Sequence, residues 1–202
     1  MRKKVIASIF GAALFVISGA TSAQLGGLLG GNKGAESTVT AESLVKSYVT
    51  GTQQVMNAKS SMLTALGLKE AAEKEALAAK NLTQGATTEN LEDVAKIQTE
   101  SSKALTDAMA AKKGKLTADS KKTYAIGLIE MVKGLKSYAG MSGDVKNFKP
   151  GITSIGGAAG AATHVVKTLP DNISNTKATL QSAINFAKEN KIEVPADATS
   201  LL

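Results

Sequence analysis

Only one histidine, His164, is available for metal binding or proton transfer in this chain of 202 residues. Zinc sites built from two or more histidines are therefore excluded. A serine hydrolase could use His164 as its base, but no Gly-x-Ser-x-Gly turn precedes it. The chain also lacks cysteine and the Gly-x-x-x-x-Gly-Lys-Ser/Thr loop that binds phosphates. We expect a protein that is not an enzyme and that uses no metal and no cofactor.

Acidic residues occur in two patches that also hold lysines at helical spacing: Glu70, Glu73 and Glu75, and then Glu89, Glu92 and Asp93. Paired carboxylates can serve as acid and base in glycoside hydrolysis. Glutamates interleaved with lysines more often form solvated ion pairs on the surface of a helix. We therefore expect both patches to be exposed.

His164 also ends a strip of small residues. Gly156, Gly160 and His164 recur every fourth residue in the segment IGGAAGAATHVV, so on a helix they share one face. Small residues usually permit close approach of a neighbouring helix, which is the interpretation we favour. The alternatives are a groove for a ligand or partner with His164 at its polar end, a glycine-rich loop, and a membrane-active segment. The last is the least compatible, because residues 152–166 are too few to span a bilayer.

Lys59 falls in the apolar sector of the first expected helix. A lysine in that position can line a polar pocket and have a lowered pKa. More often the four-carbon stem covers apolar surface while the amine reaches water. We favour the second interpretation and keep Lys59 as a candidate pocket residue.

A second pair of glycines lies inside an apolar segment. Gly127 and Gly134 are seven residues apart, along one edge of a face that holds Met131 and Tyr138. Each glycine costs a helix about 0.5–1 kcal/mol relative to alanine, so tight packing of a neighbouring helix should offset that cost. The alternative is a slot for an apolar or amphiphilic ligand between helices.

Positive charge is mild and comes almost wholly from lysine. Removal of Arg2, Lys3 and Lys4 with an N-terminal leader would lower the formal net charge from +7 to +4, and Arg2 is the only arginine. Arginine and aromatic rings are the side chains that read and stack nucleic-acid bases, and the chain has no tryptophan. The composition therefore argues against specific nucleic-acid binding.

The body of the chain is rich in Ala, Lys, Leu, Thr and Ser, a composition that favours helices. Apolar residues recur at helical period and predict five helices, over residues 40–66, 68–84, 88–113, 117–139 and 174–190. The sequence thus predicts an all-α, single-domain bundle of five or six amphipathic helices over residues 37–192. Residues 193–202 are expected to be a loose C-terminal tail.

Two finer expectations concern the second half of the chain. The helix 117–139 is apolar on two sides, because Ile126 and Ile129 point away from its main face. A helix of this kind is expected to lie at the centre of a bundle. Residues 140–173 are the least regular segment, and Pro150 and Pro170 are expected to fall at breaks.

The N-terminus has the three parts of a secretory signal peptide. Basic residues 2–4 precede an apolar run from Val5 to Ile17, and small residues follow up to Ala23. The run is shorter than the about 20 residues of a membrane span, so we expect cleavage before Gln24 and no stable transmembrane span afterwards. Residues 24–36, with their many glycines, are expected to form a flexible arm.

These observations predict an exported, periplasmic or extracellular protein without catalytic activity. Its expected role is to bind or support another macromolecule, such as a protein or a component of the cell envelope. Two alternatives stay open: a carrier of a small apolar or amphiphilic ligand near Gly127, Gly134 and Tyr138, and a membrane-active protein that uses the Gly/Ala-rich segment.

Overall fold

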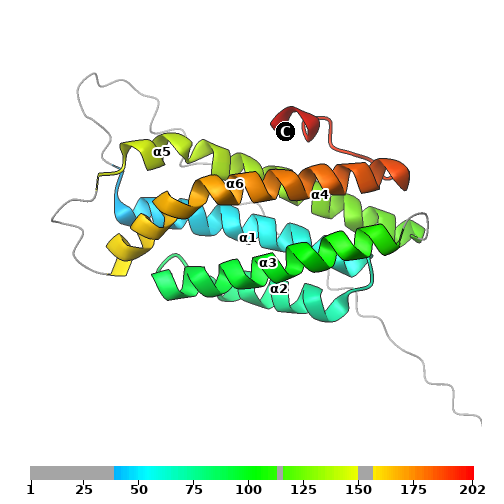
Figure 1. Cartoon of the computed structure of the whole chain (residues 1–202), viewed down its shortest axis with the longest axis horizontal. Helices are drawn as coiled ribbons and strands as arrows, with labels where there is room; N and C mark the ends of the chain where they lie inside the picture. Colours follow the sequence, from blue (N-terminus) through cyan, green and yellow to red (C-terminus); the bar gives the residue numbers. More distant parts are fainter. Residues whose placement is uncertain (1–38, 113–115, 150–156) are drawn as a thin grey trace, which may run out of the picture. The chain divides into compact units, whose positions relative to one another are not determined.

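The computed structural model describes residues 39–112, 116–149 and 157–202. The expected signal peptide 1–23, the arm 24–36 and Gly156 lie outside this part of the chain. Within it the chain forms helices α1 to α6 and a short 3-10 helix, with no strand, which confirms the all-α helical bundle (Figure 1). None of these described helices is both long and apolar enough to cross a membrane.

α1 (Ala41–Ala65) lies at the centre of the bundle, where it packs against α2, α3, α4 and α6. A capping box starts the helix: Thr40 Oγ1 accepts from the Ser43 amide, and Ser43 Oγ accepts from the Thr40 amide. Leu44 and Leu63, at opposite ends of the helix, are both buried. Burial along the whole length explains why α1 has four neighbours.

α2 (Lys69–Asn81) and α3 (Thr88–Ala111) follow as an antiparallel pair against α1 (Figure 1). Gly67, with φ of +79°, makes the turn into α2, a backbone conformation that favours glycine. α2 buries only Ala72, Glu75 and Ala79, so it covers the core rather than forming its middle. Thr87 caps α3 through the Asn90 amide.

α4 (Ala118–Gly140) packs mainly against α1 and α6, and α5 (Ser142–Asn147) continues from its end. The expected main face is buried, including Leu128 and Leu135. Ile126 and Ile129 remain 56% and 45% exposed. The prediction that this helix is central was therefore wrong, because its second apolar side contains only these two large residues and no helix of the described part of the chain covers them.

α6 (Gly157–Glu189) is the longest helix and includes Pro170. The expected irregular segment is thus helical from Gly157 onward, and the predicted break at Pro170 was wrong. Proline lacks the amide that would bond to the carbonyl of Val166. Val165 and Leu169 before it, and Leu180 after it, are all buried in the core. This burial on both sides of the proline favours continuation of the helix.

The C-terminal residues differ from the expected loose tail. They include the 3-10 helix η1 (Thr199–Leu201), which packs against α4. Ala198 is fully buried, and Asp197 forms an ion pair with Lys136 of α4. A few apolar side chains and one ion pair attach this segment to the bundle.

Candidate functional site: a polar groove between α3 and α6

Two adjoining pockets lie along the contact between α3 and α6, and they share Thr99, Asn172 and Asn175. Together they form what we call the α3–α6 groove. The inner pocket has a volume of about 280 Å³ and is lined by Val55, Lys59, Gln98, Thr99, Ser102, Met131, Asn172, Asn175, Thr176, Ala178 and Thr179. The outer pocket has a volume of about 430 Å³ and is lined by Tyr48, Glu92, Ala95, Lys96, Thr99, His164, Thr168, Asp171, Asn172 and Asn175.

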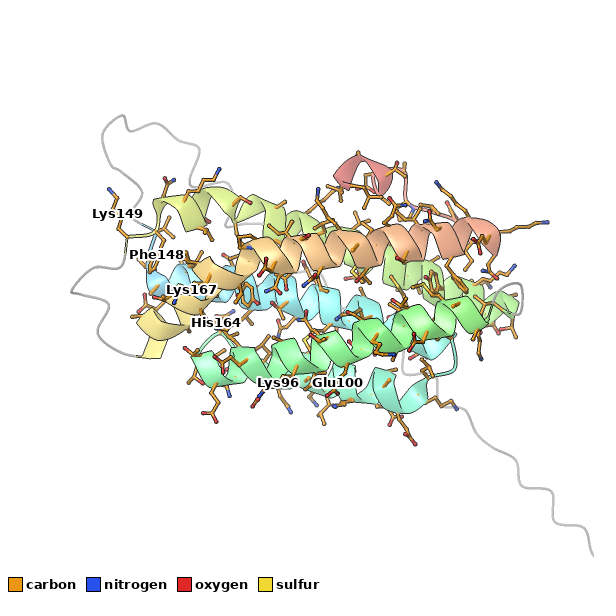
Figure 2. All side chains as sticks on the ribbon, in the orientation of Figure 1. Lys96, Glu100, Phe148, Lys149, His164 and Lys167 are labelled. Carbon is orange, nitrogen blue, oxygen red and sulfur yellow. The ribbon has the colours of Figure 1, made fainter. Side chains whose placement is uncertain are left out.

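Figure 2 views the groove with α6 and α3 in front, His164 and Lys167 labelled on α6 and Lys96 and Glu100 on α3. α1 contributes Val55 and Lys59 to the inner pocket, and α4 contributes Met131. The groove therefore has polar walls on α3 and α6, and its inner pocket reaches the central helix.

Lys59 is buried, with an exposed fraction of 2%. Its Nζ donates to the carbonyl oxygen of Gln98 at 2.8 Å and to Ser102 Oγ at 3.1 Å. Burial lowers the pKa of Lys59, and the nearby Glu75 carboxylate opposes that shift. The favoured expectation that this amine reaches water was wrong, because polar groups of α3 meet it inside the bundle. Lys59 instead belongs to a pocket wall.

Glu75 of α2 is the counter-charge of Lys59. Its Oε1 lies 3.3 Å from Lys59 Nζ, and its exposed fraction is 0%. Neither carboxylate oxygen has a well-aligned hydrogen bond among the described residues. Burial raises the pKa of Glu75, while Lys59 lowers it. The prediction that Glu75 lies on a solvated face was thus wrong: it sits among the alanines that α2 buries.

Two stacked tyrosines separate the groove from the core. The rings of Tyr48 and Tyr138 have centroids 5.7 Å apart. Asn172 Nδ2 of α6 donates to Tyr48 Oη at 2.6 Å, and Thr52 Oγ1 lies 2.8 Å from Tyr138 Oη. Tyr138 is fully buried, and desolvation raises the pKa of its hydroxyl. Tyr138 is therefore a core residue, and Tyr48 is the tyrosine that reaches the outer pocket.

The helical strip that ends at His164 faces α3. A Cβ placed on Gly160 would lie 3.3 Å from Thr88 Oγ1, which indicates close approach of the two helices. His164 Nδ1 lies 4.0 Å from Glu92 Oε1, and both residues line the outer pocket. Gly160 thus serves helix packing, while His164 stands at one end of the groove.

Gly127 and Gly134 serve the packing of α4 on α1. A Cβ on Gly127 would come within 2.7 Å of Met62 Cγ and 2.9 Å of the Ala58 carbonyl oxygen. One on Gly134 would come within 2.6 Å of Val55 Cγ2. The space considered for an apolar ligand beside these glycines is therefore filled by α1. Of that group, only Met131 reaches the groove.

The polar residues of the groove walls were not predicted as site residues from the sequence. Asn172, Asn175, Thr176 and Thr179 follow the spacing i, i+3, i+4, i+7, so they share one face of α6. Gln98, Thr99 and Ser102, at positions i, i+1 and i+4, likewise share one face of α3. The signal was present in these periodic stripes of amides and hydroxyls. Asn172 was missed because its segment was expected to be irregular. The other six residues lie on helices that were predicted, but polar residues on a helix usually face solvent, so the stripes were not recognised as walls of a groove.

The chain was compared with protein-family models, with curated proteins and with solved structures, and no match was found in any of the three.

Proposed function

We propose that this chain is an exported, non-catalytic binding protein that holds an extended segment of another polypeptide in the α3–α6 groove. The observation that carries the proposal is the pair of stripes of uncharged polar side chains that line the inner pocket, one on α3 and one on α6. The partner is a protein of the cell envelope or of the extracellular space.

The chemistry of the groove suits a peptide backbone. The carboxamides of Gln98, Asn172 and Asn175 each carry donors and an acceptor, and the hydroxyls of Thr99 and Thr179, which donate to carbonyls of their own helices, can accept. An extended peptide presents amide donors and carbonyl acceptors in alternation, and each must find a partner when it leaves water. A wall of groups that both donate and accept meets that need.

Nucleobases fit the same groove less well. Recognition of bases commonly uses aromatic rings as stacking platforms. Among the described residues that line the groove, the aromatic rings are the imidazole of His164, at one end, and Tyr48, which is 4% exposed and stacked on Tyr138. The groove therefore offers hydrogen bonds rather than a flat apolar face.

The two alternatives have less support. An apolar carrier would need the space beside Gly127 and Gly134, which Met62 and Val55 occupy. A membrane-active segment would have to withdraw Ala161, Ala162 and Val165 from the core, where all three are fully buried. Neither is the function that we propose.

Export is part of the proposal and rests on residues 1–23. Intact-mass measurement of the protein from its native host tests it, with Gln24 as the expected first residue. A cytoplasmic protein that still begins at Met1 would contradict export.

The partner can be captured by a photo-crosslinking amino acid placed at Asn175, an exposed residue of the groove. Ser182, exposed on the same helix and outside both pockets of the groove, is the matched control position. Irradiation in the native host should join the Asn175 variant, and not the Ser182 variant, to a discrete polypeptide. Equal crosslinking at both positions, or none at Asn175, would count against the proposal.

A further inference from the structure

The inner pocket of the groove contains one charged side chain, Lys59. Gln98 and Ser102, which accept its two hydrogen bonds, line the same pocket. The other lining groups are hydroxyls, carboxamides and the apolar side chains of Val55, Met131 and Ala178. No carboxylate is among the described residues that line this pocket.

The negative charge that balances Lys59 lies outside the pocket. Glu75 does not line it, and its Oε1 is 3.3 Å from Nζ, farther than the two α3 acceptors. Both Glu75 oxygens lack a well-aligned hydrogen bond within the described part of the chain. An ammonium group has three donors, and in Lys59 two are matched by short hydrogen bonds to α3. The third is poorly matched by Glu75.

We propose that the inner pocket binds a carboxylate of the peptide ligand, with Lys59 as its charged partner. The carboxylate takes the poorly matched third donor of Lys59, and the carboxamide of Asn175 donates to its second oxygen. This inference rests on the proposed peptide-binding function and adds the chemical group that anchors the peptide. A charge-assisted hydrogen bond in a place shielded from water is stronger than a neutral one.

A peptide can supply a carboxylate in two ways, through its free C-terminus or through an Asp or Glu side chain. The pocket volume of about 280 Å³ is at the small end for ligand sites, which suits one residue rather than a whole small molecule. Both sources present the same planar group. The test must therefore separate them.

The experiment is an NMR titration of the isotope-labelled full chain with three synthetic tetrapeptides. The first is tetra-alanine with a free C-terminus and an acetylated N-terminus, the second is the same peptide amidated, and the third is amidated with one internal Glu. We expect saturable shifts at the pocket residues with the first or the third peptide, and at least about fivefold weaker binding of the second. Whichever of the two binds identifies the source of the carboxylate. Equal binding of all three, or of none, would overturn the carboxylate inference.

Asn175→Asp provides the matched variant, because it is isosteric, lies at an exposed position and adds a negative charge to the pocket. It should weaken carboxylate binding at least about fivefold. Asn185→Asp, exposed on the same helix and outside the groove, should leave binding unchanged. Equal effects of the two changes would show that only net charge is sensed, and would overturn the site.

The double substitution of Lys59→Met with Glu75→Leu removes both buried charges without leaving either one alone. In that variant the carboxylate peptides should bind no better than the amidated peptide. If their preference persists, Lys59 is not the anchor. A failure of these titrations, with crosslinking at Asn175 intact, would reject the carboxylate anchor and leave the peptide-binding proposal standing. Loss of the Asn175 crosslink would reject the proposed function itself.

Discussion

The contact of α1 with α4 and the contact of α3 with α6 are built on opposite principles. At the first, Gly127 and Gly134 let the two helices approach until a Cβ would fall within 3 Å of the neighbouring helix. At the second, the helices leave two pockets lined largely by amides and hydroxyls. In this bundle, the closely packed glycines therefore mark a contact that stabilises the fold, and the spaced polar side chains mark the place where we propose that a ligand binds.

Breaking the buried ion pair should have the largest effect. Lys59→Met leaves the Glu75 carboxylate buried without its counter-charge, and we expect a loss of about 3–5 kcal/mol in the free energy of unfolding. Adding Glu75→Leu should restore stability or exceed it by about 1–4 kcal/mol, since well-packed apolar residues often replace such pairs. Urea unfolding of the single and double variants measures both. A single variant as stable as the wild type would show that the pair is not buried.

Removing a buried side chain from the closely packed contact of α4 should have the next largest effect. Leu135 of α4 has an exposed fraction of 1%, so Leu135→Ala should cost about 2–5 kcal/mol. The same substitution at Leu77, which is 59% exposed on α2, is the control and should cost little. Similar losses at both positions, measured by thermal or urea unfolding, would contradict the assigned core.

Replacing a residue with leucine in each of the two helix contacts should distinguish the closely packed contact from the groove most clearly. Gly134→Leu should destabilise by about 1–3 kcal/mol, because the added Cβ meets Val55 Cγ2 at 2.6 Å and the Val55 amide nitrogen at 3.0 Å. Leucine has the better helix propensity, so a surface glycine would instead gain stability. Asn175→Leu, in the groove, should change stability by no more than about 0.5 kcal/mol. A stabilised Gly134→Leu variant would contradict the packing role of Gly134.

The smallest effect is the pH dependence that the ion pair gives to stability. Burial raises the pKa of Glu75 above 4.5, so the folded state binds more protons than the unfolded state between 4.5 and the raised value. Stability should therefore fall as pH rises through that window, by at most about 1.4 kcal/mol per pH unit for one proton.

The pH dependence of stability that Lys59 contributes has the opposite sign. Its lowered pKa makes stability fall as pH drops from 10.5 toward the folded value. Both slopes should vanish in the Lys59→Met, Glu75→Leu variant, compared with the wild type by urea unfolding at a series of pH values. Identical pH profiles for the two proteins would contradict a buried, titrating pair.

The helical class and much of the core could be predicted because apolar period and capping are local properties of the chain. The buried face of α4 is an example. The position of α1 at the centre could not be predicted, because two isoleucines on α4 look the same in a sequence whether or not a neighbour covers them. Only the packed bundle shows that Ile126 and Ile129 are exposed.

The site was predicted in fragments. Lys59, Met131 and His164 were all candidates, each for a different reason, and the fold brings them to one groove. What joins them is the helix through Pro170, where burial of Val165 and Leu169 overrides a local signal for a break. Glu75 escaped prediction because an alanine-rich sequence with alternating Glu and Lys gives no sign of which face is covered.

Hydrogen–deuterium exchange can establish whether the α3–α6 groove holds the partner. The chain is measured alone and in complex with the partner captured at Asn175. A partner in the groove should slow amide exchange in residues 98–102 and 172–179, with no change in residues 122–133 around the exposed Ile126 and Ile129. Protection of residues 122–133, with residues 98–102 and 172–179 unchanged, would place the partner on the outer face of α4 and contradict the proposed binding site.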